Sequence, residues 1–238
     1  MAGHSKFKNI MHRKGAQDAK RAKIFTRLGK ELSVAVKMGA DPESNSRLRT
    51  AIASCRSANM PNDNIQKVLK KAEMGDGLDY VDIRYEGYGP QGTAFIVEAL
   101  TDNKNRTASE VRSTFSKLNG NLAELGSVSY LFQKIGYICF PLEACDPETF
   151  FEVAIDFGAI DVISENKLNE VFTETENFIS INEKLINKFG EAVEASIIWK
   201  PNEIIYIKEK DSETIVKLYE ALDEIEDVQN VYSNFEFS

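Results

Sequence analysis

The charge of this chain changes sign near residue 75. Residues 1–75 carry 16 Lys and Arg against 6 Asp and Glu, a net charge of +10, whereas residues 76–238 carry 13 against 31, a net charge of −18. A step of this size indicates a domain boundary and different binding partners on its two sides. The basic part suits phosphate and the acidic part repels it, so a bound polyanion is expected to dock on the basic part.

The composition is that of a folded protein in a reducing compartment. The 238 residues are 42% hydrophobic and 28% charged, which predicts two or three compact units. No apolar run approaches the roughly 20 residues of a membrane span, and the N-terminus lacks the apolar segment of a secretory signal. The three cysteines show no CxxC spacing. We therefore expect a cytoplasmic protein with no membrane partner.

Three short amphipathic helices are predicted in the basic part. In the first, roughly 17–38, apolar residues recur every four positions. The second covers about 46–58, and the third opens at Pro61 with an apolar stripe at Ile65, Val68, Leu69 and Ala72. Residues 1–15 have no amphipathic period and are expected to form an exposed arm. The arm and the three helices together predict a basic domain over residues 1–79.

Beyond a linker predicted at 73–92, rich in Gly and Asp, strands alternate with helices. Residues 93–100 read as a buried strand, the capping-box pattern Thr107-Ala-Ser-Glu110 as the start of a helix, and about 127–133 as a second strand. The tail, 203–238, predicts a strand, a helix and a strand. Each of the two segments is only half of a sheet domain.

The segment between these halves predicts a complete domain of its own. Its expected elements are a strand at 136–141, a helix after Asp146-Pro147, strands near 160–174 and 177–182, a helix near 183–189 and a strand at 193–199. This order is the βαββαβ plan of ferredoxin-like domains. The predicted fold is therefore α+β in three domains: the three-helix basic domain and two ferredoxin-like βαββαβ domains, one inserted in the other. The expected boundaries are 1–79, 80–134 with 203–238, and 135–202.

The basic domain supplies the candidate nucleic-acid-binding residues. Lys and Arg that displace condensed counterions give affinity for phosphates without reading sequence. A solvated charged face is the alternative interpretation. The candidate residues are Lys6, Lys8, His12, Arg13, Lys14, Lys20, Arg21, Lys23, Arg27, Arg47, Arg49, Lys70 and Lys71.

Two further motifs have alternative interpretations. The segment TDNKNRT, 101–107, leads into a helix whose N-terminus could hold a phosphate with Lys104, Arg106 and Arg112, or could be capped by Thr107 with solvated charges around it. GYGPQG, 87–92, lacks the Gly-Lys-Ser/Thr ending of a phosphate-binding loop. It is expected to form a tight turn at a hinge between domains, with a binding contact as the alternative.

Catalysis is not expected. His4 and His12 lack the nearby Cys or carboxylate partners of a metal site and the orienting acid of a general base. The many carboxylates beyond residue 140 fit solvated faces. We therefore predict no enzyme, no cofactor, no metal and no small-molecule substrate.

Four long motifs in order resemble the YebC family. They are MAGHSKFKNIMHRKGAQDAKRAKIFTRLGKEL, ANMPNDNIQKVLKKA, YEGYGPQGTAFIVEALTDNKNRTASEVRSTFSK and GSVSYLF. The resemblance runs along the whole chain and implies a three-domain protein without known enzymatic activity. Members of that family have been described as DNA-binding transcriptional regulators, others act in translation at the ribosome, and mitochondrial relatives are translational activators of cytochrome oxidase.

The expected partner is therefore DNA, ribosomal RNA, or both, with the ribosome as a further candidate. The main hypothesis is a DNA-binding transcriptional regulator, and the alternative is a ribosome-binding translation factor that relieves stalling. No helix-turn-helix with palindromic dimer logic is evident, which favours weakly specific DNA binding or structured RNA. A nucleic-acid enzyme and a protein-interaction scaffold are the rivals from other classes.

Overall fold

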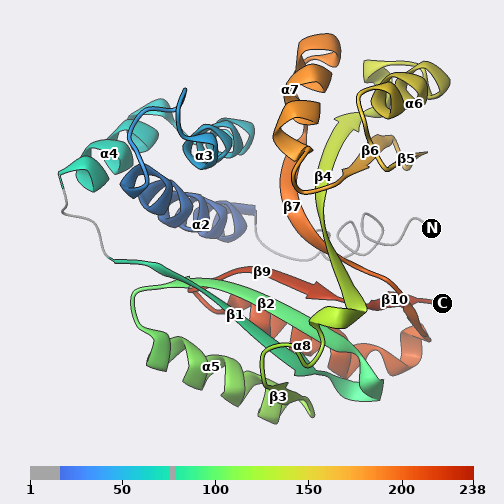
Figure 1. Ribbon diagram of the computed structural model, residues 1–238. Coiled ribbons are helices and arrows are strands. Elements are labelled where there is room, and N and C mark those ends of the chain that lie inside the picture. Colours follow the sequence, from blue (N-terminus) through green and yellow to red (C-terminus); the bar gives the residue numbers. More distant parts are fainter. Residues whose placement is uncertain (1–16, 75–78) are drawn as a thin grey trace. The chain divides into compact units, whose positions relative to one another are not determined.

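The computed structural model describes residues 17–74 and 79–238 and has a mixed α/β architecture (Figure 1). The chain forms two compact units. One spans residues 134–199, and the other combines the described residues up to 133 with 200–238. The helical bundle and the discontinuous sheet fall in the same unit, so the three predicted domain boundaries stay a prediction.

The helical bundle agrees with the prediction from hydrophobic spacing. Its helices are α2 (Gln17–Lys37), α3 (Ser46–Ser57) and α4 (Asn62–Glu73). Leu32, Leu48, Cys55 and Ile65 meet in its core. Asn45 joins two of the helices, because its side-chain oxygen caps α3 at the Leu48 N–H while its amide nitrogen donates to carbonyls at the end of α2.

A four-stranded sheet forms the centre of the larger unit outside the bundle. Its order is β3 (Asn121–Ala123), β1 (Val81–Tyr88), β2 (Ala94–Thr101) and β9 (Val228–Ser233), with each neighbouring pair antiparallel. Helices α5 (Lys104–Lys117) and α8 (Glu213–Glu224) pack on one face of it (Figure 1). Two short parallel strands, β8 (Ile205–Ile207) and β10 (Phe235–Phe237), form a separate pair.

Strand β1 corrects the prediction of a linker over 73–92. Its sequence VDIRYEGY alternates apolar and polar residues as far as Glu86, which is a strand pattern that the neighbouring Gly and Asp residues concealed. The turn GYGPQG therefore joins β1 to β2 within one sheet through the 3-10 turn Pro90–Gly92, and does not lie at a hinge between domains. A side chain at Gly89 would meet Phe95 and Thr93 at 2.5 and 2.6 Å, so the turn requires glycine there.

Two other elements of this unit begin elsewhere than predicted. Helix α5 starts at Lys104 and is capped by Asn103, whose side chain accepts the Arg106 N–H, so Thr107 is not the cap. The predicted strand at 127–133 contains the 3-10 turn Ser129–Leu131, and the extended chain begins at Phe132.

The buried Glu86 carboxylate holds this 3-10 turn in place. It accepts the N–H groups of Val128 and Ser129 at 2.9 and 3.0 Å. Burial alone would raise the pKa of Glu86, but these donors, with the Gly126 N–H and the charge of Arg84, lower it overall.

The unit 134–199 follows the predicted βαββαβ plan. Its elements are β4 (Phe132–Pro141), α6 (Pro147–Asp156), β5 (Asp161–Glu165), β6 (Leu168–Thr173), α7 (Phe178–Phe189) and β7 (Glu194–Pro201), in the sheet order β5-β6-β4-β7. A 3-10 turn, Leu142–Ala144, follows β4 in this unit, and another, Glu209–Asp211, precedes α8 in the other unit. The predicted Asp146 cap is confirmed, since its carboxylate accepts the N–H groups of Glu148 and Thr149.

Two strand predictions in this unit are wrong. The segment 160–174 contains two strands, which turn at Asn166 and Lys167 in the left-handed backbone region. The segment 177–182 belongs to α7, because Phe178, Ile181 and Leu185 are buried at helical spacing.

Candidate nucleic-acid interface

The structure divides the cations of the helical bundle into ion-paired and exposed residues. Both kinds occur on helices that the sequence predicts to be basic. The ion-paired residues are Lys23, Arg27, Lys30, Lys37 and Arg47.

Lys23 and Arg27 of α2 converge on Asp223 of α8. The Lys23 Nζ and the Arg27 Nη2 each lie 2.9 Å from a carboxylate oxygen of Asp223, one on each oxygen. Burial alone would raise the pKa of Asp223, but the charges of Arg27 and Lys23 lower it overall. Both cations, predicted to contact nucleic acid, are thus held by a carboxylate of the same chain.

Lys30 makes a more deeply buried contact with Asp227. The Lys30 Nζ lies 2.8 Å from Oδ1 of Asp227, and the two side chains are only 7% and 2% exposed. The hydroxyls of Thr101 and Thr107 donate to Oδ2 of the same carboxylate. Burial alone would raise the pKa of Asp227, but the donors, Lys30 first, hold it well below its usual value.

Arg106, predicted to be part of a second phosphate contact, also pairs with Asp227. Its Nη2 lies 2.6 Å from Oδ2 of Asp227 and 2.8 Å from Asp102. Lys104 and Arg112, the other two residues of that prediction, are exposed on α5. Arg106 is exposed as well but is paired with two carboxylates, so a phosphate contact by these three residues stays a prediction.

Arg47 of α3 forms a bidentate pair with Glu31. Its Nε and Nη2 donate to the two carboxylate oxygens at 2.7 and 2.9 Å, and Asp82 accepts further bonds at 3.3 Å. The hydrogen bond to Glu31 is the largest cause of a raised pKa for Arg47. Its charge is locally neutralised.

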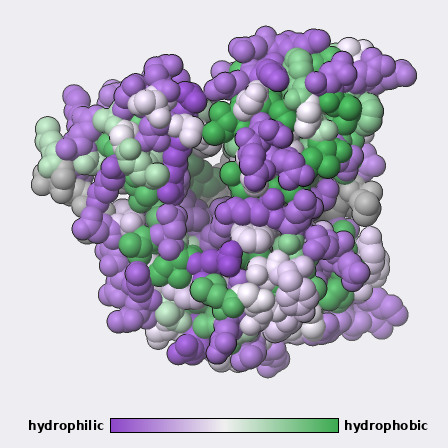
Figure 2. Space-filling view, viewed as in Figure 1, coloured by the Kyte–Doolittle hydropathy of each residue, from purple (hydrophilic) through white to green (hydrophobic). Residues whose placement is uncertain are grey.

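The exposed cations lie mainly on α4. Lys67, Lys70 and Lys71 share one face at i, i+3 and i+4 spacing, and Arg56 is exposed near the end of α3. The opposite face of α4 buries Ile65 and Ala72. Across residues 17–74 and 79–238, no carboxylate forms an ion pair with these four cations, which are defined here as the α3–α4 cation face. Figure 2 shows a largely hydrophilic surface over the bundle.

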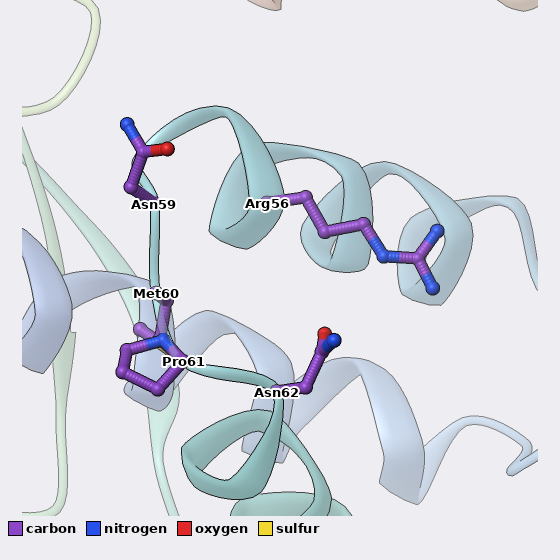
Figure 3. Close-up of a pocket in the computed structure, with 5 residues that line it drawn as sticks. All are labelled: Arg56, Asn59, Met60, Pro61 and Asn62. Carbon is purple, nitrogen blue, oxygen red and sulfur yellow. The ribbon is translucent and has the colours of Figure 1, made fainter.

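A hollow of about 460 Å³ opens at the turn between α3 and α4. It is lined by Arg56, Asn59, Met60, Pro61 and Asn62, and Figure 3 shows Arg56 and Asn62 projecting from the two helices. The first turn of α4 has no side-chain cap. Backbone N–H groups at such a helix start attract anions.

Arg21 belongs to the same region. Its Nη2 donates to the Asn59 carbonyl at 3.3 Å, and its guanidinium lies 5.3 Å from the centre of the Phe25 ring. The side chain remains exposed, so Arg21 can add a positive charge beside the hollow.

The remaining predicted binding residues are Arg49, Lys20 and five residues that lie outside the described part of the chain. Arg49 donates to the carbonyls of Pro42 and Glu43 in the turn before α3. Lys20 belongs to α2. The residues that lie outside the described part of the chain are Lys6, Lys8, His12, Arg13 and Lys14.

The prediction of binding residues omitted Arg56 and Lys67. The signal for Lys67 was present, since it lies one helical turn before Lys70 and Lys71 and opposite the apolar stripe of α4. Arg56 also had a signal, since the second helix is expected to expose Arg47, Arg49 and Arg56 while it buries Leu48, Ile52 and Cys55. Its place beside the hollow depends on how the chain turns at Asn59, which adopts a φ of 56°.

The described residues contain no group of three His, Cys, Asp or Glu side chains that could hold a metal ion. In the same residues, no helix combines the length and apolar character needed to cross a bilayer.

The family models for TACO1/YebC proteins match nearly the whole chain. The N-terminal domain model matches residues 5–75, and the model of the second and third domains matches residues 80–235. The chain belongs to the TACO1/YebC family. This confirms the resemblance found in the four sequence motifs.

Relatives within the TACO1/YebC family are similar over their full length. Two probable transcriptional regulatory proteins from two strains of Rickettsia bellii are each 52% identical over 100% of this chain and 94% or 95% of their own length. A crystal structure of a conserved hypothetical protein from Aquifex aeolicus has a TM-score of 0.86 and 41% identity, covering 95% of this chain and 94% of that one.

Proposed function

We propose that this protein is a non-enzymatic regulator of gene expression that binds nucleic acid, as a DNA-binding transcriptional regulator in the cytoplasm. The observation that carries the proposal is the α3–α4 cation face, whose charges are not neutralised by carboxylates within the described residues. The names of the Rickettsia relatives, probable transcriptional regulatory proteins, support the same conclusion.

Electrostatics explains why this face would bind a polyanion in an acidic protein. Each Lys or Arg that contacts a phosphate releases condensed counterions, and the affinity gained falls as salt rises. The remainder of the chain, with its net charge of −18, repels phosphate and so restricts docking to the basic side. In this proposal Arg21, Lys70 and Lys71 bind phosphates together with Arg56, Lys67 and the cations at residues 6–20.

A pair of matched charge reversals tests the proposal. Lys70→Glu with Lys71→Glu changes the α3–α4 cation face, whereas Lys208→Glu with Lys210→Glu makes the same change of charge at exposed residues elsewhere. We expect only the first pair to weaken binding to a generic DNA duplex, and to reduce the slope of log K against log salt by about 2. Equal effects of the two pairs would refute a specific role for this face.

A ribosomal RNA target is the second candidate, because the lysine-rich exposed face suits any phosphate backbone. Three of its four cations are lysines, whose ammonium groups bind phosphates as point charges and so give affinity for a phosphate backbone of either kind. Such a face suits structured RNA as well as duplex DNA.

Crosslinking in cells, followed by sequencing of the attached nucleic acid, separates the two targets. Recovery of promoter DNA without ribosomal RNA supports the transcriptional regulator. Recovery of ribosomal RNA, together with co-sedimentation with ribosomal subunits that is lost in Lys70→Glu, Lys71→Glu, supports the translation factor.

A further inference from the structure

Two cations of α2 are arranged around a single internal anion. Lys23 and Arg27 lie one helical turn apart and bind the two oxygens of the Asp223 carboxylate, each at 2.9 Å. The Arg27 Nη2 also donates to the Asp223 backbone carbonyl. A phosphate group could fill the same position between the two cations that the Asp223 carboxylate fills.

The contact leaves part of Arg27 unsatisfied. Its Nε is buried and has no hydrogen-bond partner among the described residues, because Asp223 engages only the Nη2 end of the guanidinium. A guanidinium binds an oxyanion best through two parallel N–H donors. A phosphate that took the place of the Asp223 carboxylate, with more acceptor oxygens, could also accept from this Nε.

The Asp223 contact is also accessible, unlike its neighbour. The side chains of Lys23, Arg27 and Asp223 are 28%, 19% and 35% exposed, whereas those of Lys30 and Asp227 are 7% and 2% exposed. Asp227 receives donors from four side chains and is enclosed by them. The Asp227 contact therefore serves as a permanent anchor, and the Asp223 contact is one that an external anion can reach.

We propose that Asp223 is an intramolecular competitor of nucleic acid, occupying a phosphate-binding position formed by Lys23 and Arg27. The inference rests on the proposed function. A polyanion bound at the α3–α4 cation face raises the local phosphate concentration near α2, displaces the Asp223 carboxylate and gains two further contacts. In the free protein, the same carboxylate lowers the affinity for stray polyanions, because the competing contact must first be broken.

The test compares Asp223→Asn with Glu220→Gln in the full-length protein. Glu220 is an exposed residue on the same helix. Glu220→Gln removes one negative charge, as Asp223→Asn does, and is therefore the matched control. The probes are a fluorescent generic DNA duplex and a single-stranded RNA of equal length. We expect Asp223→Asn to tighten binding at least about fivefold, and Glu220→Gln to have much less effect. The gain should vanish when Lys23→Gln and Arg27→Gln are added.

Equal effects of Asp223→Asn and Glu220→Gln would overturn the inference. If Lys70→Glu, Lys71→Glu still weakens binding in that case, the proposed function survives and only the competitor role falls. If neither wild type nor Asp223→Asn binds either probe, both fall.

A measurement on the wild-type protein covers the case in which Asp223→Asn does not fold. Hydrogen exchange is followed at the end of α8, residues 219–226, with and without the DNA duplex. Displacement of Asp223 predicts faster exchange there on binding. Unchanged or slower exchange would contradict the proposal.

Discussion

Among single residues, Asp227 connects three separate elements through one carboxylate. Its carboxylate receives Lys30 from α2, Thr101 from the end of β2, and Arg106 and Thr107 from α5. Removing the charge of this buried carboxylate leaves Lys30 and Arg106 without their counter-ion and takes away one of the two acceptor oxygens that the four donors share.

We therefore expect Asp227→Asn to lower the free energy of unfolding by about 3 kcal/mol. Urea denaturation followed by circular dichroism measures the loss. Glu110→Gln, at an exposed position on α5, is the control and should change stability by less than about 0.5 kcal/mol. A loss for Asp227→Asn no larger than that of the control would contradict the role assigned to this carboxylate.

The contribution of Asp227 should depend on pH in a defined direction. Its pKa is lowered in the folded protein, so it binds a proton less readily there than in the unfolded chain. Its stabilising effect is then complete above the unfolded value of about 4 and declines as the pH falls toward the folded value. The difference in stability between wild type and Asp227→Asn, measured by urea denaturation from pH 7 to pH 3, should shrink below about pH 4. A difference that grows on acidification would be inconsistent with this.

At the scale of helices and strands, replacing two glycines by alanine is expected to change stability in opposite directions. A Cβ on Gly87 of β1 would meet the Asn121 carbonyl oxygen and the Phe115 ring, both at 2.8 Å. Gly29 lies inside α2 with nothing within 4 Å of such an atom. We expect Gly87→Ala to destabilise the protein by about 2 kcal/mol and Gly29→Ala to stabilise it by about 0.5–1 kcal/mol. Thermal unfolding of both variants checks the two signs, and a stabilising Gly87→Ala would refute the close packing of β1.

The helices and the strands differed in how well the sequence predicted them. The helices of the bundle were predicted because their apolar residues recur at a regular spacing. Strand β1 was missed because its alternating pattern is short and follows a stretch rich in Gly and Asp. The sequence favours a strand over the first turn of α7, because Phe178, Ile179 and Ile181 are residues common in strands, whereas burial of Phe178, Ile181 and Leu185 selects the helix.

For the whole molecule, the slope of log K against log salt measures how many phosphates the protein contacts. If about six cations touch a duplex, the slope of log K against log salt is about −5. The proposed contacts on α4 and α3, together with those at residues 6–20, are sufficient for this number. Fluorescence anisotropy at several salt concentrations gives the slope, and a flat response would exclude phosphate binding as the source of affinity.

The candidate site was only partly predictable, because sequence alone counts charges but does not pair them. Lys23 and Asp223 are 200 residues apart in the chain, and nothing in either local sequence indicates their contact. The sequence does predict that Lys70 and Lys71 are exposed, because the apolar stripe of α4 fixes which face of the helix is buried. Local periodicity therefore predicts which face a cation occupies, whereas the fold decides whether a carboxylate is already bound to it.

The unit 134–199 begins and ends at two adjacent strands, β4 and β7, with the Lys134 ammonium over the Trp199 ring. In the other unit, Asn202 donates to the carbonyls of Leu131 and Tyr130, so the two cut points there are also neighbours. Replacing residues 134–199 by a short Gly-Ser bridge should leave a remainder that still unfolds cooperatively. A fluorescent reporter domain whose two termini lie close together could therefore be inserted between residues 133 and 200.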